Sequence, residues 1–272
     1  MTHDTSRALL HIHGTDAESF LQGLLTQDVS QAKPNALCFS AMLSPQGKWQ
    51  HDFFLWRSGE GFFLDHLSAH SELLQKRLKL YKLRAKVSIE PVPAMQLYYH
   101  GDGMPDPRHE ALPKRLWSTT PHDGLAPESY HQIRLALGIP DGNSDVTENE
   151  TLLDASYDYL HAVSFTKGCY VGQEITARMH YKQVVRKGFY AVYSDAPLTP
   201  YTPILSGEQV VAELRSAEGK HGIAFARFDT VEAARAHGYT VNGHPVTLSI
   251  PTWEEKKFAT FVAHASAHAG GA

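Results

Sequence analysis

The chain has little of what builds disulfide-linked, membrane-spanning or strongly charged proteins. It has only two cysteines, Cys38 and Cys169, which cannot form a disulfide framework, and we therefore expect a cytoplasmic protein in a reducing compartment. No apolar run is long enough to span a bilayer, and the start of the chain lacks a basic segment followed by an apolar one, so no membrane partner is expected. The formal net charge of −4 argues against a dedicated nucleic-acid-binding protein.

Charge is nevertheless unevenly distributed along the chain. Residues 76–86 contain six basic residues and no acidic one, residues 141–158 contain six acidic residues and no lysine or arginine, and residues 175–194 are again basic without acids. The basic residues are Lys76, Arg77, Lys79, Lys82, Arg84 and Lys86 in the first run and Arg178, Lys182, Arg186 and Lys187 in the last. Such runs are typical of solvated faces as well as of surfaces that bind charged partners.

Hydrophobic periodicity predicts strands and helices packed in layers over the N-terminal part. A strand ends at Gly14, a helix follows, residues 36–56 form a hairpin around the Ser44–Gly47 turn, and residues 68–82 form an amphipathic helix. This order is typical of an α+β fold. From residue 188 on, short strands separated by proline and glycine favour a small β-barrel or sandwich. The last residues are expected to fray, and their His264–His268 spacing alone is weak evidence for a metal site.

The segment Ser164–Glu174 contains the densest chemistry of the sequence. Two glycines by themselves are typical of a tight turn. Lys167 close to Cys169, and a helix that begins near Gly172, would both stabilise the thiolate, the form that acts as nucleophile or metal ligand. Because one thiolate cannot complete a zinc or iron–sulfur site, further ligands would come from a partner, a small thiol or distant residues. Glu174 and Arg178 have the spacing of a surface ion pair on a helix.

The segment Lys167–Glu174, together with Arg178, resembles the signature of the YgfZ family. These folate-binding proteins are linked to iron–sulfur cluster assembly and repair and are related to the T protein of the glycine cleavage system. The resemblance extends over about residues 7–250 through the segments Gly14–Asp16, Phe20–Asp28, Ser44–Lys48, Lys82–Val87 and Arg134–Pro140. Residues 163–170 are most similar to the mitochondrial and alphaproteobacterial branch.

The resemblance implies a T-protein-like α+β fold, with two α+β subdomains and a C-terminal antiparallel β-barrel around a central hole. Residues 1–185 would form the folate-binding region, residues 186–255 the barrel, and residues 256–272 a flexible tail. The bound cofactor would be tetrahydrofolate or a derivative.

The resemblance also implies site residues. Asp154 matches by position the acidic residue that holds the pterin ring in T proteins, although aspartate is one methylene shorter and the usual preceding proline is missing; a carboxylate can accept paired hydrogen bonds from a pterin. The other expected cofactor-binding residues are Arg134, Gly168, Tyr170, Gly172, Gln173, Glu174 and Arg178. Where T proteins have an acidic pair, this chain has His51–Asp52, which leaves Asp52 as a candidate catalytic acid.

These features favour a tetrahydrofolate-binding accessory factor in the assembly or repair of iron–sulfur clusters, which would indirectly support cluster-dependent tRNA modification. Cys169 would be the nucleophile or the ligand of a transient shared cluster, Lys167 would activate it, and the partners would be cluster carrier or client proteins. The alternative is a folate-dependent aminomethyltransferase that uses Asp52, so enzymatic activity stays open. A third hypothesis, RNA binding by the two basic runs, lacks stacking aromatics beyond Tyr81 and Tyr181, which argues against direct nucleic-acid binding.

Overall fold

The computed structural model describes residues 2–142, 144–182 and 186–269, and the side chains as far as residue 263. The chain forms two compact units. The first comprises Met1–Tyr130 and Leu160–Gln173, and the second comprises His131–Tyr159 and Glu174–Ala272. The chain therefore passes between the units three times, and none of these crossings falls at residue 185, where the sequence placed its domain boundary.

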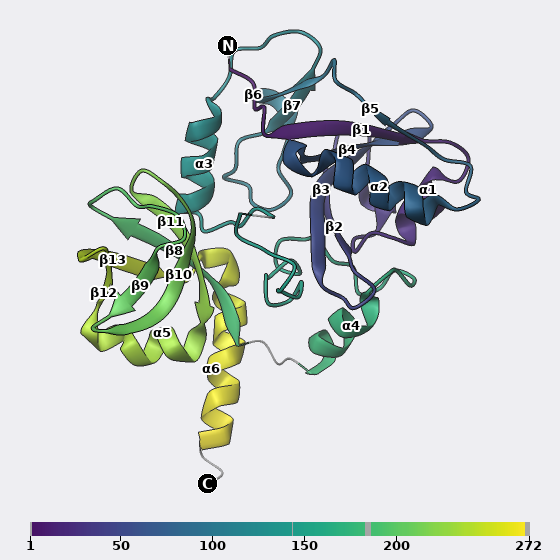
Figure 1. Cartoon of the computed structure of the whole chain (residues 1–272). Coiled ribbons are helices and arrows are strands. Elements are labelled where there is room, and N and C mark those ends of the chain that lie inside the picture. The colour runs from purple at the N-terminus through teal and green to yellow at the C-terminus, as the bar shows by residue number, and fades with distance from the viewer. Residues whose placement is uncertain (1, 143, 183–185, 270–272) are drawn as a thin grey trace. The chain divides into compact units, whose positions relative to one another are not determined.

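The first unit is built on a five-stranded antiparallel sheet with the strand order β2-β3-β4-β1-β5 (Figure 1). The strands are β1 (Arg7–His13), β2 (Cys38–Leu43), β3 (Trp49–Ser58), β4 (Gly61–Leu67) and β5 (Ser88–Pro91). Two helices, α1 (Ala17–Gln22) and α2 (Ser71–Lys82), pack on one face of the sheet. Leu21 and Leu74 are completely buried there, in one cluster with Leu10 and Leu64. The alternating and helical apolar patterns of the sequence thus meet in one core.

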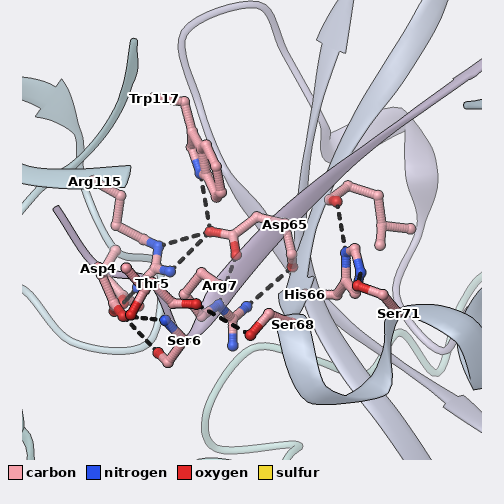
Figure 2. A network of polar contacts seen from close by, with 12 residues as sticks. Asp4, Thr5, Ser6, Arg7, Asp65, His66, Ser68, Ser71, Arg115 and Trp117 are labelled. Atoms are coloured by element: carbon pink, nitrogen blue, oxygen red, sulfur yellow. Dashed lines mark hydrogen bonds and ion pairs between the residues drawn. The ribbon is translucent and has the colours of Figure 1, made fainter. Parts of the chain in front are cut away.

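The opposite face of this sheet is held by a buried polar network (Figure 2). Asp65 on β4 accepts hydrogen bonds from Arg7 Nε at 2.7 Å, Arg115 Nη2 at 2.8 Å and Trp117 Nε1 at 3.1 Å. Burial disfavours the charge on Asp65, but the guanidinium groups of Arg115 and Arg7 outweigh burial and hold the pKa of this carboxyl below its ordinary value. Arg115 and Trp117 belong to β7 (Arg115–Ser118), which pairs with β6 (Gln96–Met104), so the network ties this ribbon to the sheet.

The second unit contains a closed antiparallel barrel with the strand order β10-β11-β8-β13-β12-β9. Its strands are β8 (Lys187–Ser194), β9 (Pro203–Ser206), β10 (Gln209–Glu218), β11 (His221–Arg227), β12 (Tyr239–Val241) and β13 (His244–Ser249). The strand pattern of the sequence allowed a barrel or a sandwich, and the structure is a barrel.

Besides α1 and α2, the described residues form the helices α3 (Pro127–Ala136), α4 (Gln173–Lys182), α5 (Phe228–Ala234) and α6 (Glu255–Ala269). Short 3₁₀ helices cover Val29–Gln31, Ser68–His70, Arg235–His237 and Thr252–Glu254. α6 occupies most of the segment from residue 256 on, where the sequence predicted a flexible tail. Phe258 and Phe261 contact Phe228 of the barrel core, with ring centroids 5.3 Å apart in both pairs, and this apolar contact stabilises the helix. The side chains of His264 and His268 lie outside the described residues. Within the described part of the chain, no helix is long and apolar enough to cross a membrane.

Candidate functional site

The segment that carries Cys169 is fastened to the loop that follows α1. Thr26, which is completely buried, donates from Oγ1 to the carbonyl oxygen of Ala162 at 2.6 Å, and its own carbonyl accepts from Ser164 N at 3.0 Å. Val171 N donates to the carbonyl oxygen of Gly23 at 3.1 Å. Two segments that are far apart in the sequence, and that both carry the family resemblance, therefore form one local structure in the first unit.

Lys167 is the strongest fastening between these two segments. Its Nζ donates to the carbonyl oxygens of Gln22 at 2.8 Å, Leu25 at 2.7 Å and Gln27 at 3.1 Å. The last carbonyls of a helix have no partner within the helix, so a lysine ammonium satisfies them where α1 ends. Burial lowers the pKa of Lys167 to about 8, and the nearby carboxylate of Asp28 opposes that change.

This geometry gives Lys167 a positioning role that the sequence did not indicate. An ammonium group has three hydrogens, and the three carbonyls use all of them, so none is left to donate to the Cys169 thiolate. Lys167 also lies 5.2 Å above the ring of Tyr170, which is buried. Its contacts position the Cys169 segment and do not form a lysine–thiolate pair.

Cys169 itself is exposed to solvent. The buried Tyr170 follows it and Gly168 precedes it. A Cβ atom added to Gly168 would meet no other atom within 4 Å. α4 begins at Gln173, close to the predicted start. Among the described residues, no group of three or more histidine, cysteine, aspartate or glutamate side chains could hold a metal ion. The site therefore presents a single accessible thiol next to open space.

Gly172 explains why the motif contains its second glycine. Its φ of +80° is rarely adopted by other residues, and a Cβ atom there would lie 2.4 Å from the carbonyl oxygen of Ser44. The backbone of the motif thus approaches the Ser44–Gly47 turn, which also belongs to the family resemblance, more closely than any side chain would allow.

Cys38 provides a contrast to Cys169. It lies on β2 and is buried, which agrees with its position in an apolar run of the sequence. Burial raises the pKa of its thiol to about 12, and Asp28 adds to the increase. Cys38 is therefore a protonated core side chain at neutral pH, without the thiolate character that ligation or nucleophilic attack requires.

The start of α4 carries the remaining motif residues. Glu174 and Arg178 are both exposed, and Gln173 is half-buried. The expected ion pair between Glu174 and Arg178 does not occur among the ion pairs of the described residues. Both side chains extend into solvent, where a ligand or partner could reach them.

Asp154, the predicted pterin-binding residue, lies in the second unit and is half-buried. Its Oδ2 accepts from Thr151 Oγ1 at 2.7 Å, and its carbonyl oxygen accepts from Lys257 Nζ at 2.9 Å. A cavity of about 260 Å³ lies next to it, lined by Leu153, Asp158, Tyr159, Met179, His180, Lys256, Lys257 and Thr260. Burial raises the pKa of Asp158, whose buried Oδ1 atom has no hydrogen-bond partner.

Arg134, the other predicted cofactor-binding residue of the second unit, is almost completely buried. Its Nη1 donates to Ile139 O and to Asp145 Oδ2, both at 2.7 Å, and its Nε lies 3.1 Å from Asp141 Oδ2. Its guanidinium thus holds the start of the acidic run in place, where Asp145 is completely buried. These contacts are structural.

The His51–Asp52 pair is divided between the two faces of the first sheet, because successive strand residues point to opposite sides. His51 lies on the helical face, 5.4 Å from the His70 ring, and burial lowers its pKa to about 3, with His70 and Arg77 acting in the same direction. Asp52 lies on the other face and is 6% exposed. The two side chains therefore do not form one acid–base pair.

The structure brings Lys167, Cys169, Tyr170 and Gly172 together in the first unit, whereas Arg134, Asp154, Glu174 and Arg178 belong to the second. Sequence reasoning missed the residues that hold the motif, namely Thr26 and the carbonyls of Gln22, Leu25 and Gln27. The polar residues within the apolar pattern of residues 20–28 were the available signal, since polar side chains beside a core usually have partners.

Comparisons with known proteins agree with this architecture. Residues 186–256 match the family model described as the CAF17 C-terminal beta-barrel domain. The human protein named iron-sulfur cluster assembly factor IBA57, mitochondrial, is 31% identical over 296 residues, which cover 91% of this chain and 83% of the human one. The IBA57 homologue of Neurospora crassa is 33% identical over 227 residues, covering 69% and 52%. The glycine cleavage system aminomethyltransferase T of Bartonella henselae is similar in structure, with a TM-score of 0.69, 13% identity, and 91% and 84% of the two chains covered.

The structural similarity confirms the expected T-protein-like α+β fold with its C-terminal barrel, and at this identity it shows the fold alone. The central hole stays a prediction. The expected cytoplasmic location is contradicted, because the human and Neurospora crassa relatives are named as mitochondrial proteins. The number of cysteines distinguishes oxidising from reducing compartments, and it carries no information about a particular organelle.

Proposed function

This chain belongs to the IBA57 family of iron–sulfur cluster assembly factors, and we propose that it acts in the assembly or repair of iron–sulfur clusters. The Cys169 thiolate would be the ligand that this chain itself contributes to a cluster shared with a partner. The observation that carries the proposal is the position of Cys169. It is exposed, yet it lies on a segment fixed by Lys167, Thr26 and Gly172. A ligand that receives a cluster from another protein must be accessible and held in place.

A single thiolate requires a partner. Iron–sulfur clusters are held by several cysteine thiolates, and the described residues contain no group of three or more metal-ligating side chains. The remaining ligands would come from a cluster carrier or client protein, or from a small thiol. The open space beside Gly168 leaves room for such a partner to approach the sulfur. The cluster is cargo in this proposal, and this chain contributes one ligand and its orientation.

The proposal extends to tetrahydrofolate or a derivative as a ligand near Asp154. The Oδ1 atom of Asp154 makes no hydrogen bond within the described residues, so this carboxylate retains capacity to accept from a pterin. The adjacent cavity of about 260 Å³ is lined in part by Asp158, whose Oδ1 atom is buried without a hydrogen-bond partner. Arg134 has no part in this ligand site, because its guanidinium binds Asp141 and Asp145.

The narrower YgfZ assignment and an indirect role in tRNA modification remain parts of the proposal that rest on the motif resemblance. No observation favours the alternative aminomethyltransferase. Its candidate acid, Asp52, is 6% exposed, and His51 lies on the other face of the sheet.

The cluster proposal is tested by mixing the purified protein anaerobically with a cluster-loaded carrier and recording visible circular dichroism. We expect the spectrum of the carrier to change with wild type and not with Cys169→Ser. Cys38→Ala is the matched control, because it removes the other, buried thiol, and it should behave as wild type. An equal spectral change with Cys169→Ser would remove the thiol from the mechanism.

The folate proposal is tested separately by calorimetry with tetrahydrofolate. Asp154→Asn should weaken binding by about tenfold or more, because an amide cannot accept the paired hydrogen bonds of the pterin. Asp195→Asn removes a carboxylate that is 94% exposed in its side chain, and it should leave the affinity unchanged. Equal affinities of the two variants would exclude Asp154 as the pterin ligand.

A further inference from the structure

The outward face of α2 combines exposed leucines with cations that have no acidic partner. α2 lies on one face of the sheet (Figure 1). It buries Leu74 and Leu78 completely in the core cluster, whereas Leu73 is 47% and Leu80 is 71% exposed. Lys76 and Arg77 lie between these two leucines at the spacing that places residues on one helix face. Because the core face of the helix is already filled, the exposed leucines contribute little to folding.

Leu83, directly after the helix, adds an independent observation. It is 87% exposed and has φ 46° and ψ −110°, with a hydrogen bond of 2.8 Å from Ala85 N to Lys82 O closing the turn around it. These angles are close to the first central position of a type II′ turn, which glycine normally occupies. A leucine at this position strains the backbone, and because its side chain is exposed it gains no stabilising contacts with the core. Backbone strain of this kind is concentrated at functional positions.

The charges of this surface are also uncompensated. The ion pairs of the described residues include none of the six basic residues between Lys76 and Lys86. The only acid on α2 is Glu72, in its first turn. Unpaired cations next to exposed leucines complement a surface that is acidic and apolar at once.

We propose that the α2 face, formed by Leu73, Lys76, Arg77, Leu80, Leu83 and Arg84, is a docking surface for an amphipathic helix of a partner protein whose apolar stripe is flanked by aspartate or glutamate. The leucines of α2 would pack against the apolar stripe of the partner helix, and the cations would pair with the acidic residues on either side of that stripe. This inference goes beyond the cluster proposal, because it does not depend on Cys169.

Two other ligands of basic surfaces fit less well. A helix that lies on a membrane inserts a wide apolar face, but the wide apolar face of α2, with Leu74 and Leu78, is packed on the sheet. Single-stranded RNA is bound by stacking on exposed aromatic rings, and Tyr81, the aromatic residue of this helix, packs against the core cluster. An acidic helix requires neither feature.

The test uses the full-length protein and a fluorescein-labelled synthetic peptide with a helical stripe of leucines flanked by glutamates, followed by fluorescence anisotropy. The double variant Lys76→Glu/Arg77→Glu should weaken peptide binding by about tenfold or more, and added salt should weaken binding to wild type. The matched control Lys187→Glu/Lys220→Glu makes the same charge change on the barrel unit and should bind as wild type. Equal binding by both double variants, or no binding to wild type, would overturn the proposal.

Leu83→Gly separates docking from folding. Since the leucine is exposed and its backbone angles suit glycine, the variant should keep or raise the melting temperature while peptide binding weakens by about fivefold or more. Unchanged peptide binding would remove Leu83 from the surface.

Vesicles containing cardiolipin, and polyuridylate, are tested in parallel. If the α2 variants lose binding to either of these and not to the peptide, the ligand is a membrane or RNA and the proposal is wrong. Cys169→Ser should bind the peptide as wild type, so failure here and failure of the cluster proposal are distinguishable.

Discussion

Replacing Lys167 by methionine, which retains the length of the side chain and removes the ammonium, should release the Cys169 segment from the loop after α1. Three charge-assisted hydrogen bonds would be lost, with N–O distances between 2.7 and 3.1 Å. Bonds of this type contribute about 1.5–3 kcal/mol each. The carbonyls regain water at this partly exposed site, and methionine avoids the cost of burying a charge. We therefore expect a net loss of about 2–3 kcal/mol.

The loss should be seen in two measurements. Calorimetry should show a melting temperature lower by about 5–10 °C, and amide hydrogen exchange should accelerate in residues 161–173. Lys187→Met is the control, because it removes an exposed lysine from β8 of the barrel. If Lys167→Met melts and exchanges like Lys187→Met, the ammonium does not hold the segment and the positioning role assigned to Lys167 is refuted.

Three further predictions concern the surrounding structure. Gly172→Ala should lower the free energy of unfolding, measured by chemical denaturation, by about 1–3 kcal/mol, because its Cβ would lie 2.4 Å from Ser44 O at a positive φ. Gly168→Ala should leave this free energy unchanged, because its Cβ meets no atom within 4 Å. Equal effects of the two variants would contradict this explanation. The pKa of His51 falls from 6.5 to about 3 on folding, so the unfolded state binds more protons between these values and stability is lost as the pH falls from about 6.5 to about 3. His51→Gln should reduce that slope by about 1.4 kcal/mol per pH unit, and an unchanged slope would exclude His51 as its source. Asp65→Asn should lower the free energy of unfolding by about 3–5 kcal/mol, because it leaves Arg7 and Arg115 without their buried counter-charge. The exposed pair Arg227–Asp229 gives the comparison, since Asp229→Asn should lower this free energy by at most about 1 kcal/mol.

The sequence was informative where local pattern determines structure. The apolar patterns of β1 to β4 were sufficient to predict the α+β unit. The short strands bounded by glycine and proline after Lys187 predicted a small barrel or sandwich, and the family resemblance chose the barrel. The burial of Cys38 followed from its apolar neighbours. The helix α6 was not predicted, because the contacts of Phe258 and Phe261 with the barrel core, which stabilise it, cannot be seen in a short alanine-rich segment.

The site was harder to predict, because its determinants are backbone atoms far away in the sequence. Lys167 was expected to act as a cation close to Cys169, and the sequence did not show that it binds the carbonyls of Gln22, Leu25 and Gln27. Side-chain identity contains no information about which carbonyls a helix end leaves unpaired in the folded chain. For His51 and Asp52, strand alternation alone would have placed the two on opposite faces.

The central claim is that Cys169 carries the function, and complementation of cells that lack their own family member tests it most directly. Wild type, Cys169→Ser and Cys38→Ala are expressed to equal levels, and the activity of an iron–sulfur-dependent enzyme is measured. The expected result is that wild type and Cys38→Ala restore activity and that Cys169→Ser does not. Full restoration by Cys169→Ser would contradict it.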